Sequence, residues 1–169
     1  LSLRLAGRDG YAEDGIVDDA DLDHGSNVAD IPGGNLLICP DESFAEGTVV
    51  FDRPTAYQGR WVRGVRFEFK NGELTHLRTR ADGDRVKANY EKASGEKNRI
   101  ATIGVGVNSK VRLGFLQDGL AAGSITVAVG GNDDIGGANK TDFYFPGTLT
   151  RATLNVDGNT IVKNGKLVV

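Results

Sequence analysis

The side chains best suited to bind a metal ion or to move a proton are scarce in this sequence. His24 and His76 are the only histidines, and they lie too far apart to form a short ligand pair such as His-x-x-x-His. We interpret each of them as an exposed or hydrogen-bonded imidazole. Neither histidine predicts a metal site or an acid–base site.

An acidic run at residues 18–25 shares some features with a calcium loop. Its carboxylates alternate along the chain, and Asp30 follows Asp19 at the distance that separates the first and last ligands of an EF-hand. However, His24 stands where that loop needs glycine, and Asp30 replaces the closing glutamate. We therefore predict a solvated acidic loop.

Three further patterns each lack a feature that their chemistry requires. The glycine-rich segment 130–139 is similar to one turn of a calcium-binding β-roll, but such rolls need stacked copies. Gly104-Val105-Gly106 lacks the third glycine and the following helix of a dinucleotide loop, so we interpret these as strand glycines that allow close backbone approach. No serine lies in a glycine-framed nucleophile elbow, which argues against a serine hydrolase.

The elements that would position a site are predicted to be mostly strands. Segment 60–70 alternates apolar and charged residues, and its predicted inward face is Trp61, Val65, Phe67 and Phe69. Asn71-Gly72 predicts a two-residue turn, after which the chain runs back over 73–80. Further strands and turns are expected at 100–107, 111–115, 124–129, 148–156, Asp157-Gly158 and Asn164-Gly165.

The pattern of apolar residues predicts one helix. Asp82 is expected to cap a helix over 83–93, where Val86, Tyr90 and Ala93 fall on one face. The resulting fold class is α+β and mostly β, with antiparallel or mixed sheets, hairpins and about one to three short helices. We expect residues 1–169 to form a single domain.

Composition excludes several classes of partner. The formal net charge is −3, from 20 basic and 23 acidic residues spread along the chain, so neither nucleic acid nor an anionic membrane is an expected partner. No apolar run approaches the roughly 18 residues that cross a bilayer, and the chain start has no signal-peptide pattern. Cys39 is the single cysteine and stands in an apolar segment, which predicts a buried thiol and a cytoplasmic location.

Six short motifs occur in order along the chain. They are Pro32-Gly33-Gly34, Gly47-Thr48-Val49, segment 57–65, Gly104-x-Gly106-x-Asn108, Ala128-x-Gly130 and Gly136-Gly137-x-Asn139-Lys140-Thr141. This series resembles the carboxy-terminal, metal-binding half of the thermophilic aminopeptidases T and S, a leucyl aminopeptidase-like metallopeptidase family. The resemblance implies that the family's amino-terminal domain is absent from this chain. The lack of any methionine likewise predicts a piece of a longer protein.

The resemblance also implies a site. Family members use two metal ions, usually zinc, cobalt or manganese, to bind a peptide's amino end and activate a water. The positions that align with the family's metal pocket hold other residues here, namely Asn35, Thr102, Gly119, Thr126, Tyr144 and Pro146. Because such side chains cannot supply the carboxylate and imidazole ligands of a divalent pair, we expect no metal, no other cofactor and no catalytic residue.

Three hypotheses follow for the function. The first is a divergent, metal-free relative that serves binding, assembly or non-peptidase work. The second is an active enzyme, either a metal-dependent aminopeptidase with relocated ligands (Asp118, Asp133, Asp134 and Asp142) or an enzyme of another reaction class that uses the old pocket. The third is a structural domain that supports the missing amino-terminal part. Expected partners are a second copy, that missing domain, or an unidentified small molecule or peptide.

Overall fold

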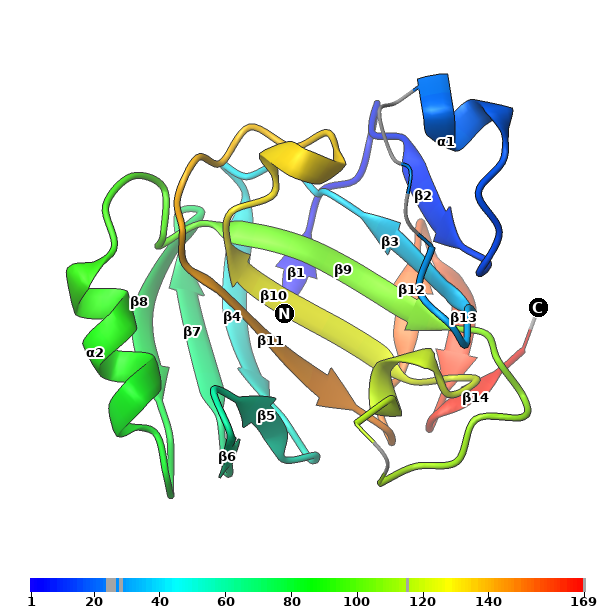
Figure 1. The fold of residues 1–169 in the computed structure, drawn as a ribbon. Helices are drawn as coiled ribbons and strands as arrows, with labels where there is room; N and C mark the ends of the chain where they lie inside the picture. The colour runs from blue at the N-terminus through cyan, green and yellow to red at the C-terminus, as the bar shows by residue number, and fades with distance from the viewer. Residues whose placement is uncertain (24–26, 28, 115, 169) are drawn as a thin grey trace.

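The computed structural model describes residues 1–23, 27, 29–114 and 116–168. Its strands form antiparallel pairs in four sheets, which confirms the predicted β-rich fold class. A long sheet crosses the front of the molecule, and two smaller sheets lie behind it (Figure 1). In strand order the sheets are β11-β10-β9-β3-β2, β1-β4-β7-β8, β12-β13-β14 and β5-β6.

The five-stranded sheet is central to every candidate site. Its strands are β2 (Gly10–Glu13), β3 (Asn35–Ile38), β9 (Ile100–Gly106), β10 (Ile125–Gly130) and β11 (Tyr144–Leu149). Side chains alternate between its faces. The inner face, which packs against the smaller sheets, carries Val127, Val129 and Phe145, all nearly inaccessible to solvent. We call the opposite side the outer face.

The four-stranded sheet contains β1 (Ser2–Leu3), β4 (Ala45–Val50), β7 (Arg66–Lys70) and β8 (Glu73–Arg78). Asn71 and Gly72 join β7 to β8 with φ values of 52° and 76°, so the predicted two-residue turn is confirmed. Phe67 and Phe69 point into the core as predicted, with exposed fractions of 0% and 4%.

The prediction of one continuous strand over 60–70 was wrong. The chain forms β5 (Thr55–Tyr57) and β6 (Arg60–Val62) as a separate hairpin, and β7 begins only at Arg66. Gly64, at a φ of 62°, bends the chain between the two strands. This bend changes which alternate positions face inward, so Val62 is buried and Trp61 is 42% exposed.

Aromatic rings tie the sheets into one core. The ring centroid of Phe67 lies 4.8 Å from that of Phe51 and 6.1 Å from that of Phe145, both in edge-to-face contact. Gly147 on β11 faces Phe51, where an added Cβ would lie 2.6 Å from ring atoms. The core therefore needs a residue without a side chain at this point.

Among the described residues, two α-helices lie outside the sheets, α1 (Asp19–Asp23) and α2 (Asp84–Lys92). Val86 of α2 is fully buried and Tyr90 packs edge-on against Phe143 at 5.2 Å, as the predicted apolar face requires. Asp82 does not cap this helix, contrary to our expectation: Gly83 is the N-cap without a side-chain bond, while Asp82 pairs with Arg63 at 3.4 Å. Within the described residues, no helix is long and apolar enough to span a membrane.

The carboxy-terminal sheet contains β12 (Leu154–Val156), β13 (Asn159–Lys163) and β14 (Lys166–Leu167), and lies behind one end of β9, β10 and β11 (Figure 1). Asp157-Gly158 and Asn164-Gly165 form its turns with positive φ at all four residues, as predicted. Short 3₁₀ helices form at η1 (Asp118–Leu120) and η2 (Asp133–Ile135).

Two predicted strands were not observed as such. Residues 111–114 form no strand, because the chain turns back at Gly114, whose N–H donates to the Asp118 carboxylate. The strand predicted over 148–156 is interrupted after Leu149, where the N–H of Thr150 donates to Asp52 at 2.8 Å instead of continuing the ladder.

Candidate functional site

The outer face of the five-stranded sheet brings together most of the residues singled out from the sequence. Thr102 lies across from Ala128, which lies across from Pro146, and Thr126 is the neighbour of Gly104 on β9. On the other side of β9, Asn35 pairs with Gly106. Because alternate residues of a strand share a face, these side chains line one surface.

Tyr144 connects two strands of this face. Its hydroxyl lies 3.3 Å from the hydroxyl of Thr102, which is completely buried, although the tyrosine as a whole is 42% exposed. Burial of the phenol raises the pKa of Tyr144, the bond with Thr102 lowers it, and the charges of Glu13, Asp134 and Cys39 raise it further. The phenol therefore stays neutral and acts as a hydrogen-bonding group near neutral pH.

A second pair of hydroxyls lies beside the first. The Oγ1 atoms of Thr126 and Thr148 are 3.4 Å apart across β10 and β11. Gly119 of η1 lies directly above them, since a Cβ added there would approach Thr126 Oγ1 to 2.8 Å. The third predicted pocket position thus covers this threonine pair.

Asn35 forms the far side of the face. Its Nδ2 donates to the Glu13 carboxylate at 3.3 Å, across the paired strands β2 and β3. Its Oδ1 is buried and has no hydrogen-bond partner among the described residues. This oxygen lies against Gly104, where an added Cβ would be 3.0 Å away, so the glycine makes room for the amide.

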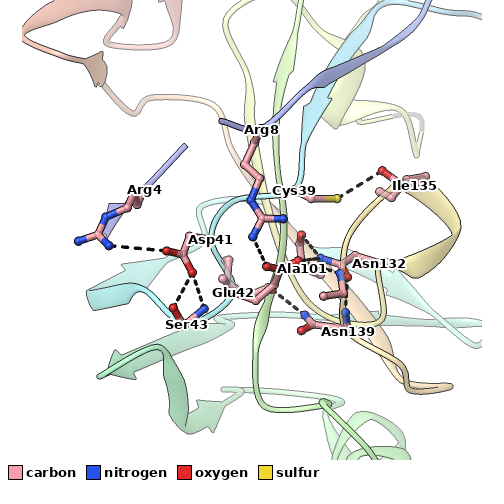
Figure 2. A network of polar contacts seen from close by, with 12 residues as sticks. Arg4, Arg8, Cys39, Asp41, Glu42, Ser43, Ala101, Asn132, Ile135 and Asn139 are labelled. Carbon is pink, nitrogen blue, oxygen red and sulfur yellow. Dashed lines mark hydrogen bonds and ion pairs between the residues drawn. The ribbon is translucent and has the colours of Figure 1, made fainter. Parts of the chain in front are cut away.

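A buried polar network fixes the loop that carries η2 at one end of this sheet. Glu42 accepts hydrogen bonds from Arg8 at 2.6 Å, from Asn132 at 3.2 Å and from the N–H of Ala138 at 2.9 Å (Figure 2). Asn139 donates to the carbonyls of Ile100 and Gly130, which anchors the same loop to β9 and β10. Burial alone raises the pKa of Glu42, but these donors and Arg8 outweigh it and hold the pKa below its usual value.

The four aspartates predicted as relocated ligands do not gather. Asp118 is held by Arg53, whose Nε lies 2.6 Å from its carboxylate. Asp133 and Asp134 are exposed on η2, and Asp142 is exposed just before β11. In the part of the chain that the structure describes, no three His, Cys, Asp or Glu side chains lie close enough together to hold a metal ion.

The two histidines add no ligand to this face. His76 is half exposed on β8, 3.4 Å from Glu68 of the neighbouring strand, as the sequence predicted for a solvated imidazole. His24 lies outside the described residues. The outer face offers hydroxyls, an amide, a phenol and the single carboxylate of Glu13, and this set does not fit a pair of divalent cations.

Sequence reasoning missed three residues at or beside this face. Glu13 pairs with Asn35, Thr148 pairs with Thr126, and Cys39 donates weakly to the carbonyl of Ile135. The alternation of side chains along β2 and β11 was the only sequence signal that could have assigned Glu13 and Thr148 to this face. Their partners depend on strand register, which the sequence does not state.

Comparison with known proteins supports the family resemblance that the six sequence motifs indicated. A family profile described as thermophilic metalloprotease (M29) matches residues 16–97. Over these residues the chain is similar to the M29 metalloproteases. The match ends before β9, so Thr102 and the four later pocket positions lie beyond it. No curated protein sequence matches the chain.

Two solved structures are similar to this chain in fold. AmpT from Thermus thermophilus is 17% identical with a TM-score of 0.66, over 85% of this chain and 43% of AmpT. A 2,5-dihydroxypyridine dioxygenase from Pseudomonas putida KT2440 is 22% identical with a TM-score of 0.61, over 79% of this chain and 43% of the dioxygenase. The chain therefore spans less than half the length of either protein. Because their names denote different proteins, one of them a dioxygenase, the shared fold does not specify a reaction.

Proposed function

We propose that this chain is a metal-independent relative of the M29 metalloproteases, which binds a ligand at the outer face and does not hydrolyse peptides. One observation carries the proposal: the aligned pocket positions share one face, and the side chains there are neutral. A divalent pair needs anionic or imidazole ligands, and without the metal no group of this face lowers the pKa of a water to neutrality.

The chemistry of the outer face favours a polar ligand without a metal. The partly exposed Tyr144 and Thr148 carry hydroxyl groups that both donate and accept hydrogen bonds, and the buried Thr102 and Thr126 lie within hydrogen-bond distance behind them. Glu13 supplies one carboxylate at the β2 edge. Such a surface suits a neutral or singly charged small molecule or a peptide segment, bound through hydrogen bonds.

Metal content and peptidase activity test this proposal together. Protein purified without chelator should contain no stoichiometric zinc, cobalt or manganese by elemental analysis. Leucyl and arginyl anilides, incubated with the protein and millimolar cobalt or zinc, should show no release that a chelator abolishes. The AmpT protein, assayed in parallel, controls for the substrates and the metal.

The relocated-ligand enzyme makes the opposite prediction. One or two equivalents of bound metal, with chelator-sensitive release that disappears in Asp118→Ala or Asp133→Ala, would establish it and overturn our proposal. As a matched control, Asp157→Ala changes an aspartate in the turn after β12, away from the outer face, and should leave any such activity unchanged.

A further inference from the structure

The solvent side of the four-stranded sheet gathers arginines that are separated in the sequence. Arg66 of β7 and Arg78 of β8 lie directly opposite each other in the ladder. Because Phe67 is buried in the core, alternation turns Arg66 and Arg78 toward the solvent, and both are exposed. Like charges at directly opposed positions destabilise a sheet, so such a pair needs another group that offsets the repulsion.

A third arginine lies beside this pair. Arg80 follows Arg78 by two residues, and its N–H donates to the carbonyl of Arg63 at 2.8 Å, which continues the pairing of the two segments beyond the strands. The side chain of Arg80 lies over Gly64, since a Cβ added to this glycine would be 2.6 Å from Cβ and 3.4 Å from Nε of the arginine. Gly64 thus makes room for Arg80 beside the start of β7, where Arg66 stands.

The carboxylates near these arginines neutralise them only in part. Glu68 lies 2.9 Å from Nε of Arg66 but 3.8 Å from Nε of Arg78. Asp52 is the other carboxylate at this end of the sheet, and it is hydrogen-bonded to the chain after β11. Within the described residues, the side chain of Arg80 has no ion pair or hydrogen bond. Three guanidinium groups therefore share the contacts of one carboxylate.

We propose that Arg66, Arg78 and Arg80 bind one phosphate group of a small phosphorylated molecule. A phosphate monoester carries between about 1.5 and 2 negative charges near neutral pH and presents three terminal oxygens, to which several guanidinium groups can bond at once. Residues two apart on an extended chain are separated by about 6.5 Å, so Arg78 and Arg80 can reach the same phosphate. Arg66 approaches it from the neighbouring strand. The proposal is independent of the function proposed for the outer face, which belongs to the five-stranded sheet.

Two other anionic partners fit these arginines less well. A carboxylate has a single charge and two oxygens, which one guanidinium satisfies, and Glu68 already supplies such a group. A nucleic acid needs basic residues that follow successive phosphates, whereas the neighbours on β4 are Val50 and Thr48. The arginines form one point of positive charge, which the fold creates in a chain with a net charge of −3.

Titration of isotopically labelled protein with inorganic phosphate tests the proposal directly, with the arginine Nε–H signals observed by nuclear magnetic resonance. At constant ionic strength, phosphate should shift the signals of Arg66, Arg78 and Arg80 along one saturating curve, with a Kd of about 1 mM. Methyl phosphate, a simple monoester, should compete for the same site. Acetate and chloride at the same ionic strength should give no saturating shift.

Variants separate a built site from general charge screening. Arg78→Gln and Arg80→Gln should each weaken phosphate binding by about tenfold or more, because each removes a charge-assisted set of donors. Both side chains are exposed, so neither change removes a buried group. Lys163→Gln removes one positive charge from the exposed surface of the carboxy-terminal sheet and, as the matched control, should leave the Kd unchanged. Arg80→Lys keeps the charge but not the planar donors and should restore only part of the affinity.

Three results would overturn the proposal. The first is the absence of a saturating shift at the arginine signals with phosphate. The second is a response to acetate or chloride equal to that with phosphate, or a Kd that Arg80→Gln leaves unchanged, either of which would indicate charge screening alone. The third is a single-stranded oligonucleotide that binds more tightly as its length increases and that methyl phosphate does not displace, which would indicate a nucleic acid as the partner.

Discussion

Cys39 shows how its surroundings decide what a reactive residue can do. The thiol is 6% exposed, and burial raises its pKa to about 11, with the charge of Glu42 adding to the shift and Arg8 partly opposing it. The thiolate is the form of cysteine that acts as a nucleophile. Because the pKa of Cys39 is raised from 9.0 to about 11, the fraction of thiolate at a given pH is about a hundredfold smaller. Cys39 is therefore a packing residue beside the outer face and not a nucleophile.

The reactivity of Cys39 checks this conclusion. Alkylation by iodoacetamide at about pH 8 should be at least about a hundredfold slower in the folded protein than in the same protein unfolded in guanidinium chloride. The unfolded chain is the internal control, because it holds the same cysteine without burial. Similar rates in both states would mean that the thiol is accessible and ionised.

Glu42 contributes stability through its ionised form. Its folded pKa lies below its ordinary value, so the unfolded chain binds the proton more readily as the pH falls. The stabilisation is therefore fully present above about pH 4.5 and is lost as the pH falls below that value. Glu42→Gln should destabilise the protein by about 1–3 kcal/mol at neutral pH, with a smaller difference near pH 3.

Urea denaturation at the two pH values measures this difference. Glu91→Gln changes an exposed glutamate on α2 and should alter the free energy of unfolding by less than about 0.5 kcal/mol at either pH. A loss for Glu42→Gln that is the same at both pH values would show that shape, and not charge, makes the network of Figure 2 stabilising.

At the scale of elements, the sequence predicted local turns well and strand partners poorly. Asn71-Gly72, Asp157-Gly158 and Asn164-Gly165 were recognised because positive φ needs particular residues, and this need is local. In contrast, β2 and β3 were missed, although they carry Glu13 and Asn35. Their apolar pattern is short, and β3, which links β2 to the rest of the sheet, pairs with β9 far along the sequence.

The difference between local patterns and long-range strand pairing also explains which residues of the site could be predicted from the sequence. Motif order assigned Asn35, Thr102, Thr126 and Tyr144 to a common pocket, and they lie on one face. The Thr126–Thr148 pair required the register of β10 against β11, which no local pattern encodes. The prediction that Trp61 points inward was wrong for a related reason, since the bend at Gly64 changes which residues of the predicted strand face the core.

Two hairpin glycines with the same backbone conformation should differ in their tolerance of alanine. Gly72 and Gly158 have φ values of 76° and 83°. A Cβ at Gly72 would meet the carbonyl oxygen of Ser43 at 2.2 Å, whereas a Cβ at Gly158 has nothing within 4 Å. Gly158→Ala should cost about 1–2 kcal/mol from backbone strain alone, and Gly72→Ala clearly more, because a neighbouring backbone must also shift.

Thermal or urea unfolding of the two single variants gives the comparison. Because Gly158→Ala carries the same backbone strain, it serves as the matched control for the steric term. Equal losses would imply that the loop around Ser43 yields without cost, and that the contact between this loop and the β7–β8 turn does not contribute to stability.

For the whole molecule, the arrangement of the sheets predicts how it unfolds. One cluster of buried residues includes Phe67 from the four-stranded sheet, Val127 from the five-stranded sheet and Val162 from the carboxy-terminal sheet. Leu154 and Leu167 pack against the same cluster. Neither smaller sheet has a separate core within the described residues, so losing one exposes the apolar face of the other.

We therefore expect the four-stranded, five-stranded and carboxy-terminal sheets to unfold in one cooperative transition. Far-ultraviolet circular dichroism reports all strands, while fluorescence of Trp61 on β6 reports the end of the molecule away from β12 to β14. The two urea curves should have the same midpoint and give the same free energy of unfolding. Val162→Ala removes a fully buried side chain from β13 and should lower both midpoints equally. If this variant instead created an early transition visible only by circular dichroism, the carboxy-terminal sheet would be an independently unfolding unit, and the shared core would not unite the molecule.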